Sequence, residues 1–168
     1  MSNRIINLDE IELHSLPAGI AATGEAARHY APKIAMVGLQ LGARKLAYNV
    51  IALEPGKKAF PFHSHRTNEE LFLVLEGSGE IRIGQDCFSI RKGDVIACPA
   101  GGAETAHQII NSGETELRYL ALSTKFPTDI IEYPDSGKYR VQAEAEGDAS
   151  AFDAINRFEN CVGYWDGE

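Results

Sequence analysis

Short apolar runs alternate with turn-forming residues through the middle of the chain. Each run is bounded by Gly, Pro, Asn or Asp, which interrupt strands and form turns. This pattern predicts strands at residues 46–53, 70–76, 80–83, 88–90, 95–98, 107–110 and 117–123. Many short strands with turns about every 8–12 residues are typical of antiparallel sandwiches and barrels. The expected fold class is therefore all-β.

The two ends of the chain have a different pattern. Residues 18–44 are rich in Ala and Gly and show no clear periodicity, which predicts loops with one helical turn. Near the end, Phe152, Ile155 and Phe158 recur at helical spacing after a start at Ser150, which predicts a short C-terminal helix packed on the barrel.

At 168 residues the chain is expected to be a single domain. Its expected parts are an N-terminal extension over residues 1–45, a barrel over residues 46–123 and a C-terminal extension over residues 124–168.

Composition and charge exclude several classes of function. With 16 basic and 24 acidic side chains, a net charge of −8 and no basic cluster, the protein is not expected to bind nucleic acid or an anionic membrane. The longest apolar stretch, residues 71–75, is far shorter than the roughly 20 residues of a transmembrane helix. Asp9, Glu10 and Glu12 stand where a signal peptide would be apolar, and the three cysteines form no CxxC pair. These features predict a cytoplasmic protein with reduced thiols.

Three histidines and one glutamate, all residue types that bind metals, are grouped at two places in the chain. His63 and His65 are two residues apart, so in a strand both imidazoles point to the same face. Glu70 follows on the next expected strand, and His107 opens a later one. Three imidazoles and one carboxylate suit a divalent transition metal, with Mn, Fe, Zn and Ni as candidates, and leave a position for substrate. Taken alone, His63 and His65 are equally well explained as surface residues of an edge strand.

The glycines and prolines around these residues complete two motifs that resemble those of the cupin family. The first is Gly56-(x6)-His63-x-His65-(x4)-Glu70-(x6)-Gly77, with one residue more than usual before the first histidine. The second is Gly93-(x5)-Pro99-x-Gly101 followed by His107-(x3)-Asn111, with three extra residues before the histidine. The stretches PAGGAETAHQIIN and EYPDSGK and the YWDGE ending resemble a group of small single-domain bacterial cupins labelled sugar-phosphate isomerases, of the mannose-6-phosphate type.

The resemblance implies a double-stranded β-helix, which is a jelly-roll barrel of two antiparallel sheets. It also implies that one divalent metal is bound by His63, His65, Glu70 and His107. Glu69 is an alternative to Glu70, because the family tolerates either spacing of the carboxylate. Glu70 is preferred because six residues then separate it from the following glycine, and because strand alternation would point Glu69 to the other face.

Glycines are expected where this chain turns sharply. Gly77, Gly93 and Gly101 occupy such places, and only glycine accepts a positive φ freely. The pair Gly77 and Gly79 is followed by an expected strand rather than a helix, which predicts a hairpin turn rather than a phosphate-binding loop.

Strand alternation also predicts the surroundings of the metal. Phe72 and Val74 share the parity of Glu70, and Ile109 shares that of His107, so these apolar side chains are expected to line the pocket. The candidate catalytic residues are Glu104, Tyr48 and Arg118, each of which is at least as well explained as a surface residue. The candidate anchors for a substrate phosphate are Arg118, Lys58 and Arg66. Cys98 is assigned mainly to core packing, with a redox role as the alternative.

Two enzyme classes and one non-enzymatic role fit this sequence. The first is a metal-dependent isomerase or lyase that acts on a small sugar-like or hydroxy-acid substrate by Lewis-acid chemistry. The second is an iron-dependent dioxygenase, because the same four ligands can serve it. The third is a non-catalytic small-molecule binding or sensor module.

The resemblance further implies a homodimer. Small cupins commonly pair by exchanging N-terminal strands, so residues 1–15 are the expected contact. The apolar positions of that segment are Ile5, Ile6, Leu8, Ile11 and Leu13.

Overall fold

The computed structural model describes residues 4–144 and 151–168. The strands are β1 His14–Ser15, β2 Lys33–Ala35, β3 Leu46–Leu53, β4 Ser64–His65, β5 Glu70–Glu76, β6 Ser78–Ile83, β7 Asp86–Arg91, β8 Val95–Cys98, β9 His107–Ile110, β10 Leu117–Thr124, β11 Thr128–Tyr133, β12 Lys138–Ala143 and β13 Phe152–Arg157. The helices are short: α1 Val37–Gln40 and the 3-10 helices η1 Gly24–Arg28, η2 Pro134–Ser136 and η3 Phe158–Asn160. None of the described helices has both the length and the hydrophobicity needed to cross a bilayer.

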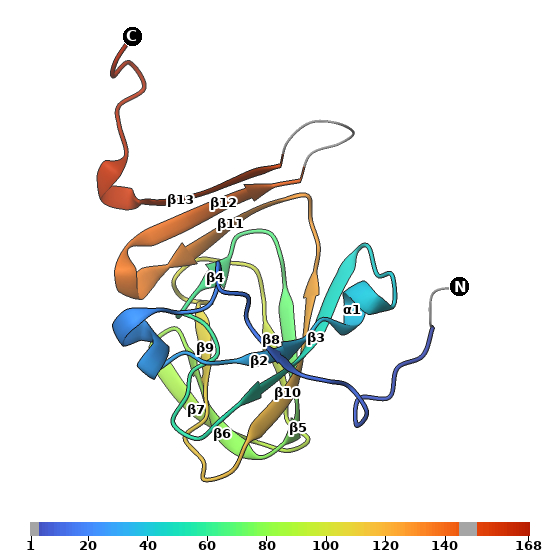
Figure 1. Ribbon diagram of the computed structural model, residues 1–168. Coiled ribbons are helices and arrows are strands. Elements are labelled where there is room, and N and C mark those ends of the chain that lie inside the picture. The colour runs from blue at the N-terminus through green and yellow to red at the C-terminus, as the bar shows by residue number, and fades with distance from the viewer. Residues whose placement is uncertain (1–3, 145–150) are drawn as a thin grey trace.

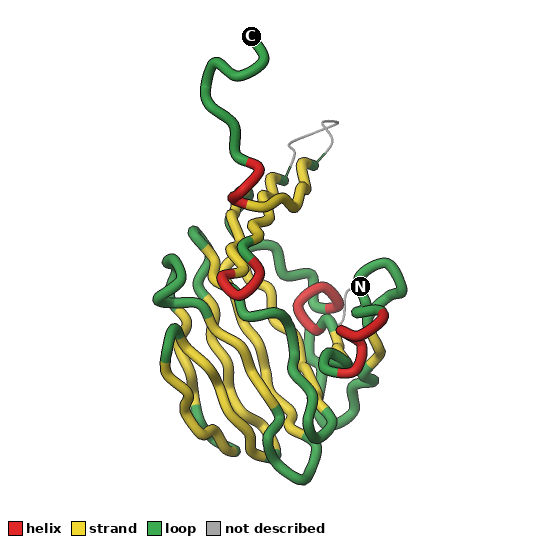
Figure 2. The backbone as a smooth tube through the Cα atoms, turned by 90° about the vertical axis from the view of Figure 1, so that its left-hand side faces the viewer, coloured by secondary structure: helices red, strands yellow, loops and turns green. Residues whose placement is uncertain are grey.

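Two antiparallel sheets face each other and form the barrel, as Figures 1 and 2 show. The larger sheet has the strand order β1-β2-β3-β10-β5-β8, and the smaller has the order β7-β6-β9. A third sheet, β13-β12-β11-β4, joins the open end of the barrel through β4 and extends beyond it. All seven strands predicted from the sequence are present, and the all-β jelly-roll prediction is confirmed.

Alternating apolar side chains of both sheets fill the barrel. Phe72 and Val74 of β5 pack inside with Leu117, Tyr119 and Ala121 of β10, and all five are buried. Because successive side chains of a strand point to opposite faces, the residues between them face outward. This alternation gives the barrel a continuous apolar core beside its open end.

The N-terminal extension covers the outer face of the larger sheet. Ala35, Val37 and Val50 form a second buried cluster on that face. The side chains packed against this cluster include Ile6, Leu8, Ile11 and Leu13 from the N-terminal segment. Most of the apolar residues expected to contact a partner thus pack within the chain, whereas the side chain of Ile5 is 81% exposed. The homodimer stays a prediction.

The predicted hairpin at Gly77 is wrong, although Gly77 is a turn residue. Gly77 has a φ of +78° and joins β5 to β6, but β5 pairs with β10 and β8 whereas β6 pairs with β7 and β9. The turn therefore carries the chain from one sheet of the barrel to the other. Gly93 also has a positive φ, of +93°. Gly101 does not; a Cβ there would lie only 2.6 Å from the side chain of Thr105, so close packing requires the glycine.

The predicted C-terminal helix is also wrong. Phe152–Arg157 forms strand β13, which pairs along its length with β12, and the 3-10 helix η3 follows. Arg140 of β12 and Asp153 of β13 form an ion pair across the two strands. Three apolar residues at a spacing of three cannot distinguish one helical turn from a strand whose partner is elsewhere in the chain. Ser150, the expected helix start, lies outside the described residues.

The region predicted as loops holds more structure than expected. Residues 18–44 contain the 3-10 helix η1, the helix α1 and the short strand β2, which pairs with β3. This strand was missed because three residues are too few to show the alternation of apolar and polar side chains that marks a strand. Its conformation is set by pairing with β3.

Candidate metal centre

Pairing between distant strands brings the four expected ligands to one end of the barrel. His63 forms a backbone bridge with His107 of β9, with the His107 amide donating to the His63 carbonyl at 2.7 Å. His65 lies on β4, which pairs with β11, and Glu70 opens β5. The ligands therefore lie on separate parts of the fold that the barrel holds together.

Three imidazole nitrogens converge on one carboxylate oxygen. The Nε2 atoms of His107, His65 and His63 lie 2.7, 3.6 and 3.7 Å from Glu70 Oε2. His63, Glu70 and His107 each offer a ligand atom within 4.8 Å of the others, a spacing that allows one metal ion. Glu69, the alternative carboxylate, is exposed. Glu70 is thus the residue that contacts the three histidines.

The other ring nitrogen of each histidine faces an oxygen acceptor. Nδ1 of His63 is 2.8 Å from the Pro61 carbonyl, and Nδ1 of His107 is 3.2 Å from the Thr105 carbonyl. A carbonyl only accepts, so both Nδ1 atoms carry the proton and both Nε2 atoms present lone pairs to Glu70. Lone pairs of His107 and Glu70 at 2.7 Å repel each other unless a positive charge lies with them. A transition-metal ion fits this donor set.

Asp129 of β11 fixes the third histidine, and sequence reasoning missed it. Its Oδ2 accepts a 2.6 Å hydrogen bond from Nδ1 of His65, and its carboxylate also accepts bonds from Thr67 and from the side-chain amide of Asn68. Carboxylates that hold the far nitrogen of a metal-binding histidine set its tautomer and orientation. Asp129 lies outside the two motifs, and no spacing rule connects it to His65.

The pKa values follow from these contacts. Burial raises the pKa of Glu70, but the close contacts of its carboxylate with the rings of His107 and His63 outweigh burial and hold it well below its usual range. Burial likewise raises the pKa of Asp129, and the hydrogen bonds from His65 and Asn68 lower it further than burial raises it. For His65, burial lowers the pKa, whereas the hydrogen bond to Asp129 and the charge of Glu70 raise it above its usual value. Both carboxylates are therefore anionic at neutral pH, and the site favours positive charge.

A cavity of about 110 Å³ adjoins three of these ligands. Its walls are mainly apolar and include Phe72 and Ile109, as predicted, whereas Val74 lies in the core away from it. The other apolar wall residues are Ile34, Ile51, Ala59, Phe60 and Ala121, and the polar ones besides the ligands are Asn49, Gln108 and Tyr119. Neither Lys nor Arg belongs to this lining.

The three candidate catalytic residues do not line the cavity. Tyr48 packs in the cluster on the outer face of the larger sheet, and Arg118 alternates with the inward-facing Tyr119. Glu104 is exposed on the loop before β9 and accepts a hydrogen bond from the amide of Gly102. The structure therefore brings the four metal-ligand candidates together but not these three residues.

The candidate phosphate anchors also lie apart from the cavity. The guanidinium of Arg66 is bound to Glu132 at 2.6 Å, and neither it nor Lys58 lines the cavity.

Comparisons with known proteins agree with this architecture. Residues 49–123 match the family model of the cupin domain. A 74-residue segment is 38% identical to an uncharacterized protein of Methanocaldococcus jannaschii, and this match covers 42% of the chain and 57% of that protein.

Two solved structures show the extent of the likeness. One, from Silicibacter pomeroyi, is described as a sugar phosphate isomerase from a cupin superfamily; it has a TM-score of 0.76 and 25% identity, over 96% of this chain and 98% of its own. Another, from Thermotoga maritima, is described as a predicted oxalate decarboxylase. It has a TM-score of 0.57 and 21% identity, over 73% of this chain and 99% of its own, and supports the fold alone.

Proposed function

Residues 49–123 of this chain match the family model of the cupin domain, and from that likeness we propose a metal-dependent enzyme that acts on a small oxygen-bearing molecule by isomerase or lyase chemistry. The observation that carries the proposal is the convergence of three Nε2 atoms on Glu70 Oε2 beside a mainly apolar cavity. The residues that would hold one divalent Mn, Fe, Zn or Ni ion are His63, His65, Glu70 and His107. When bound, such an ion supplies a Lewis acid that polarises substrate oxygens.

The chain itself supplies orientation and exclusion of water. Hydrogen bonds to Pro61, Thr105 and Asp129 hold the three imidazole rings in place, so little reorganisation is needed when a ligand binds. The apolar walls keep bulk water from the reacting atoms. Phe72 belongs to these walls, and its ring centroid lies 5.5 Å from that of His107.

Tyr119 would act as a hydrogen-bond donor to the substrate. It is 1% exposed and lines the cavity, and burial together with the charge of Glu70 raises its pKa. Its hydroxyl therefore keeps its proton at neutral pH, and the proposed role is to donate that hydrogen to a substrate oxygen.

The lining argues for a substrate without a phosphate at this cavity. Phosphate sites in proteins use Arg, Lys or backbone N–H groups at helix N-termini, and no Arg or Lys lines this cavity. An unphosphorylated sugar-like molecule or a hydroxy acid is the proposed substrate class.

The test is exchange of a substrate C–H proton. Metal-loaded protein is incubated in D2O with unphosphorylated aldoses and hydroxy acids, and loss of the proton next to the carbonyl is followed by NMR. The proposal predicts exchange with the wild type and with His29→Ala, which changes an exposed histidine, and none with His107→Ala. Exchange that persists in His107→Ala would contradict it.

An iron-dependent dioxygenase is the second candidate function. Apolar walls beside the ligands favour it, because they admit O2 and an apolar substrate together. Oxygen uptake by the iron-loaded protein with no C–H exchange would favour this candidate. Substrate binding without either reaction would favour a non-catalytic binding module.

A further inference from the structure

A second, larger cavity lies behind the wall of the first. It measures about 380 Å³ and lies between the N-terminal segment and the residues leading into β4. Leu16, Ile20, Ala26 and Tyr30 line it from the N-terminal side, and Pro61 and Phe62 line it from the barrel. Figure 1 shows η1, in blue, and the η2 turn, in orange, close together on this side of the molecule.

Its lining is apolar, with charged groups at one edge only. Asp135, Ser136 and Lys138 contribute the polar part, where β11 leads into β12. Asp135 is paired with Arg82 at 2.8 Å, so its charge is compensated. A cavity of about 150 Å³ with apolar walls holds a benzene ring, so this volume accommodates an aromatic ring or a branched hydrocarbon group.

A single layer of side chains separates the two cavities. Ala59 and Phe60 line both. Gln108 lines the first cavity; its Nε2 donates to the Phe60 carbonyl at 2.6 Å and lies 3.4 Å from the hydroxyl of Tyr30, which lines the second. The Phe60 ring is half-buried and lines both spaces, so a different rotamer of this one side chain would open a path between them.

We infer that the second cavity holds an apolar group of the substrate, whose oxygen-bearing end lies at the three histidines and Glu70. The substrate class is then a molecule with oxygen donors at one end and an aromatic or branched aliphatic group at the other. The oxygen-bearing end rests on the proposed function, whereas the apolar end rests on the second cavity alone.

The first experiment compares catechol with 4-tert-butylcatechol on zinc-loaded protein by calorimetry. Zinc has no redox chemistry, so the catechols are not oxidised by the metal. The expected result is that the tert-butyl group tightens binding about tenfold or more, because it enters an apolar cavity. Equal affinities for the two catechols would overturn the inference.

A matched pair of variants locates the effect. Ala26 lines the cavity, whereas Ala27, the next residue of the same 3-10 helix, does not, and both are exposed. Ala26→Trp is expected to remove the advantage of the tert-butyl group and leave catechol binding unchanged, whereas Ala27→Trp keeps the advantage. Ile20→Trp, at a lining position that is 71% exposed, repeats the test if Ala26→Trp does not fold.

Indole binding to the metal-free protein separates this inference from the proposed function. Saturation-transfer NMR is expected to show indole bound to the wild type and to Ala27→Trp, with the signal lost in Ala26→Trp. Indole binding with no binding of either catechol would overturn the proposed function but support the apolar site. Indole signals that are the same in all three proteins would overturn the apolar site.

Discussion

His65 and Asp129 lie 64 positions apart in the chain, yet Nδ1 of His65 donates to Oδ2 of Asp129 at 2.6 Å. The two residues lie on the paired strands β4 and β11, and Asp129 is 4% exposed. This contact extends the candidate metal centre beyond residues 49–123 into the third sheet, so that sheet helps to position one of the candidate ligands.

Asp129→Asn is predicted to weaken metal binding. The variant loses the charge that orients the His65 ring, and loss of such a partner typically costs about 10–100-fold in metal affinity. Competition with a chromogenic chelator measures the affinity. Asp153→Asn, which changes an aspartate on the distant strand β13, is the matched control and keeps wild-type affinity. Equal affinity in the two variants would show that Asp129 does not support the centre.

Phe72→Ala is predicted to destabilise the protein by about 3–5 kcal/mol, because it leaves a cavity in the core. The Phe72 side chain is 6% exposed and contacts the rings of Tyr119 and His107. Phe88→Ala, at a side chain 51% exposed, is expected to cost less than about 1 kcal/mol. Urea denaturation of the metal-free proteins measures both free energies of unfolding, and similar losses would contradict the assignment of Phe72 to the core.

Two of the three thiols are predicted to react quickly in the folded protein. Cys87 and Cys161 are exposed, whereas Cys98 is 2% exposed and burial raises the pKa of its thiol to about 12. A buried, protonated thiol is a poor nucleophile. A thiol-reactive dye should titrate two groups in native protein and the third only after denaturation. Rapid reaction of all three thiols would mean that Cys98 is accessible and would favour the alternative interpretation of Cys98 as a redox residue.

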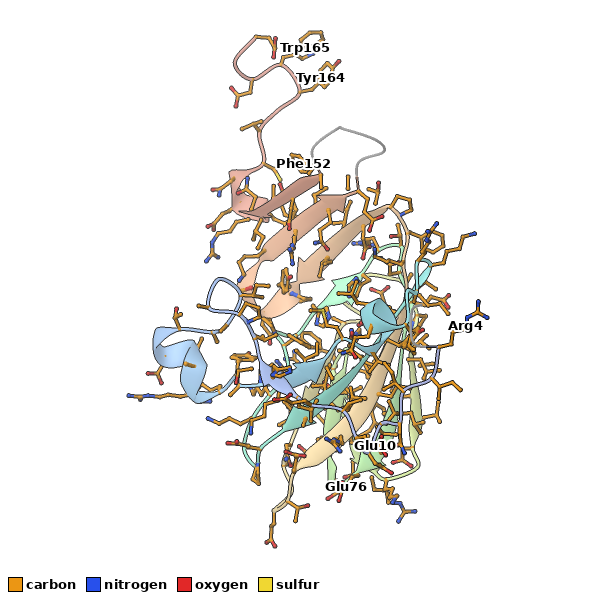
Figure 3. The ribbon with its side chains drawn as sticks, turned by 45° about the vertical axis from the view of Figure 1, so that its right-hand side comes forward. Arg4, Glu10, Glu76, Phe152, Tyr164 and Trp165 are labelled. Atoms are coloured by element: carbon orange, nitrogen blue, oxygen red, sulfur yellow. The ribbon has the colours of Figure 1, made fainter. Side chains whose placement is uncertain are left out.

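The homodimer is predicted to elute at twice the mass of the 18.3 kDa chain. If residues 1–15 form the contact, Ile5→Asp shifts the protein to the monomer mass, because it places a charge on an apolar residue that is 81% exposed. Ile155→Asp, at an exposed position of β13, should leave the dimer intact. A dimeric Ile5→Asp together with a monomeric Ile155→Asp would place the contact on the C-terminal sheet instead. That sheet carries exposed apolar side chains including Phe152, and Tyr164 and Trp165 lie on the tail beyond it (Figure 3). Elution of the unmodified protein as a monomer would refute the dimer.

The barrel was predictable because its strands carry local signals. Turn residues bound each strand, and the alternation that buries Phe72 and Val74 is visible in the sequence. The grouping of the four candidate ligands was expected from the resemblance to the cupin motifs. The choice of Glu70 over Glu69 rested on its spacing to Gly77 and on strand parity.

The remaining features depend on contacts between distant residues. Strand β13 is set by pairing with β12, and its three apolar residues at helical spacing gave the wrong element. The His65–Asp129 bond joins two segments that no local period relates. The turn at Gly77 was predicted, but its hairpin was not formed, because strand partners are chosen by the whole barrel.

Elemental analysis of three proteins tests the central claim most directly. Wild type, His65→Ala and His29→Ala are purified without chelator from cells with a balanced metal supply. The expected result is near-stoichiometric divalent transition metal in the wild type and in His29→Ala, and loss of the metal from a folded His65→Ala protein. Full metal occupancy in His65→Ala would contradict the ligand assignment, and a wild type that binds no metal even after reconstitution would contradict the metal centre itself.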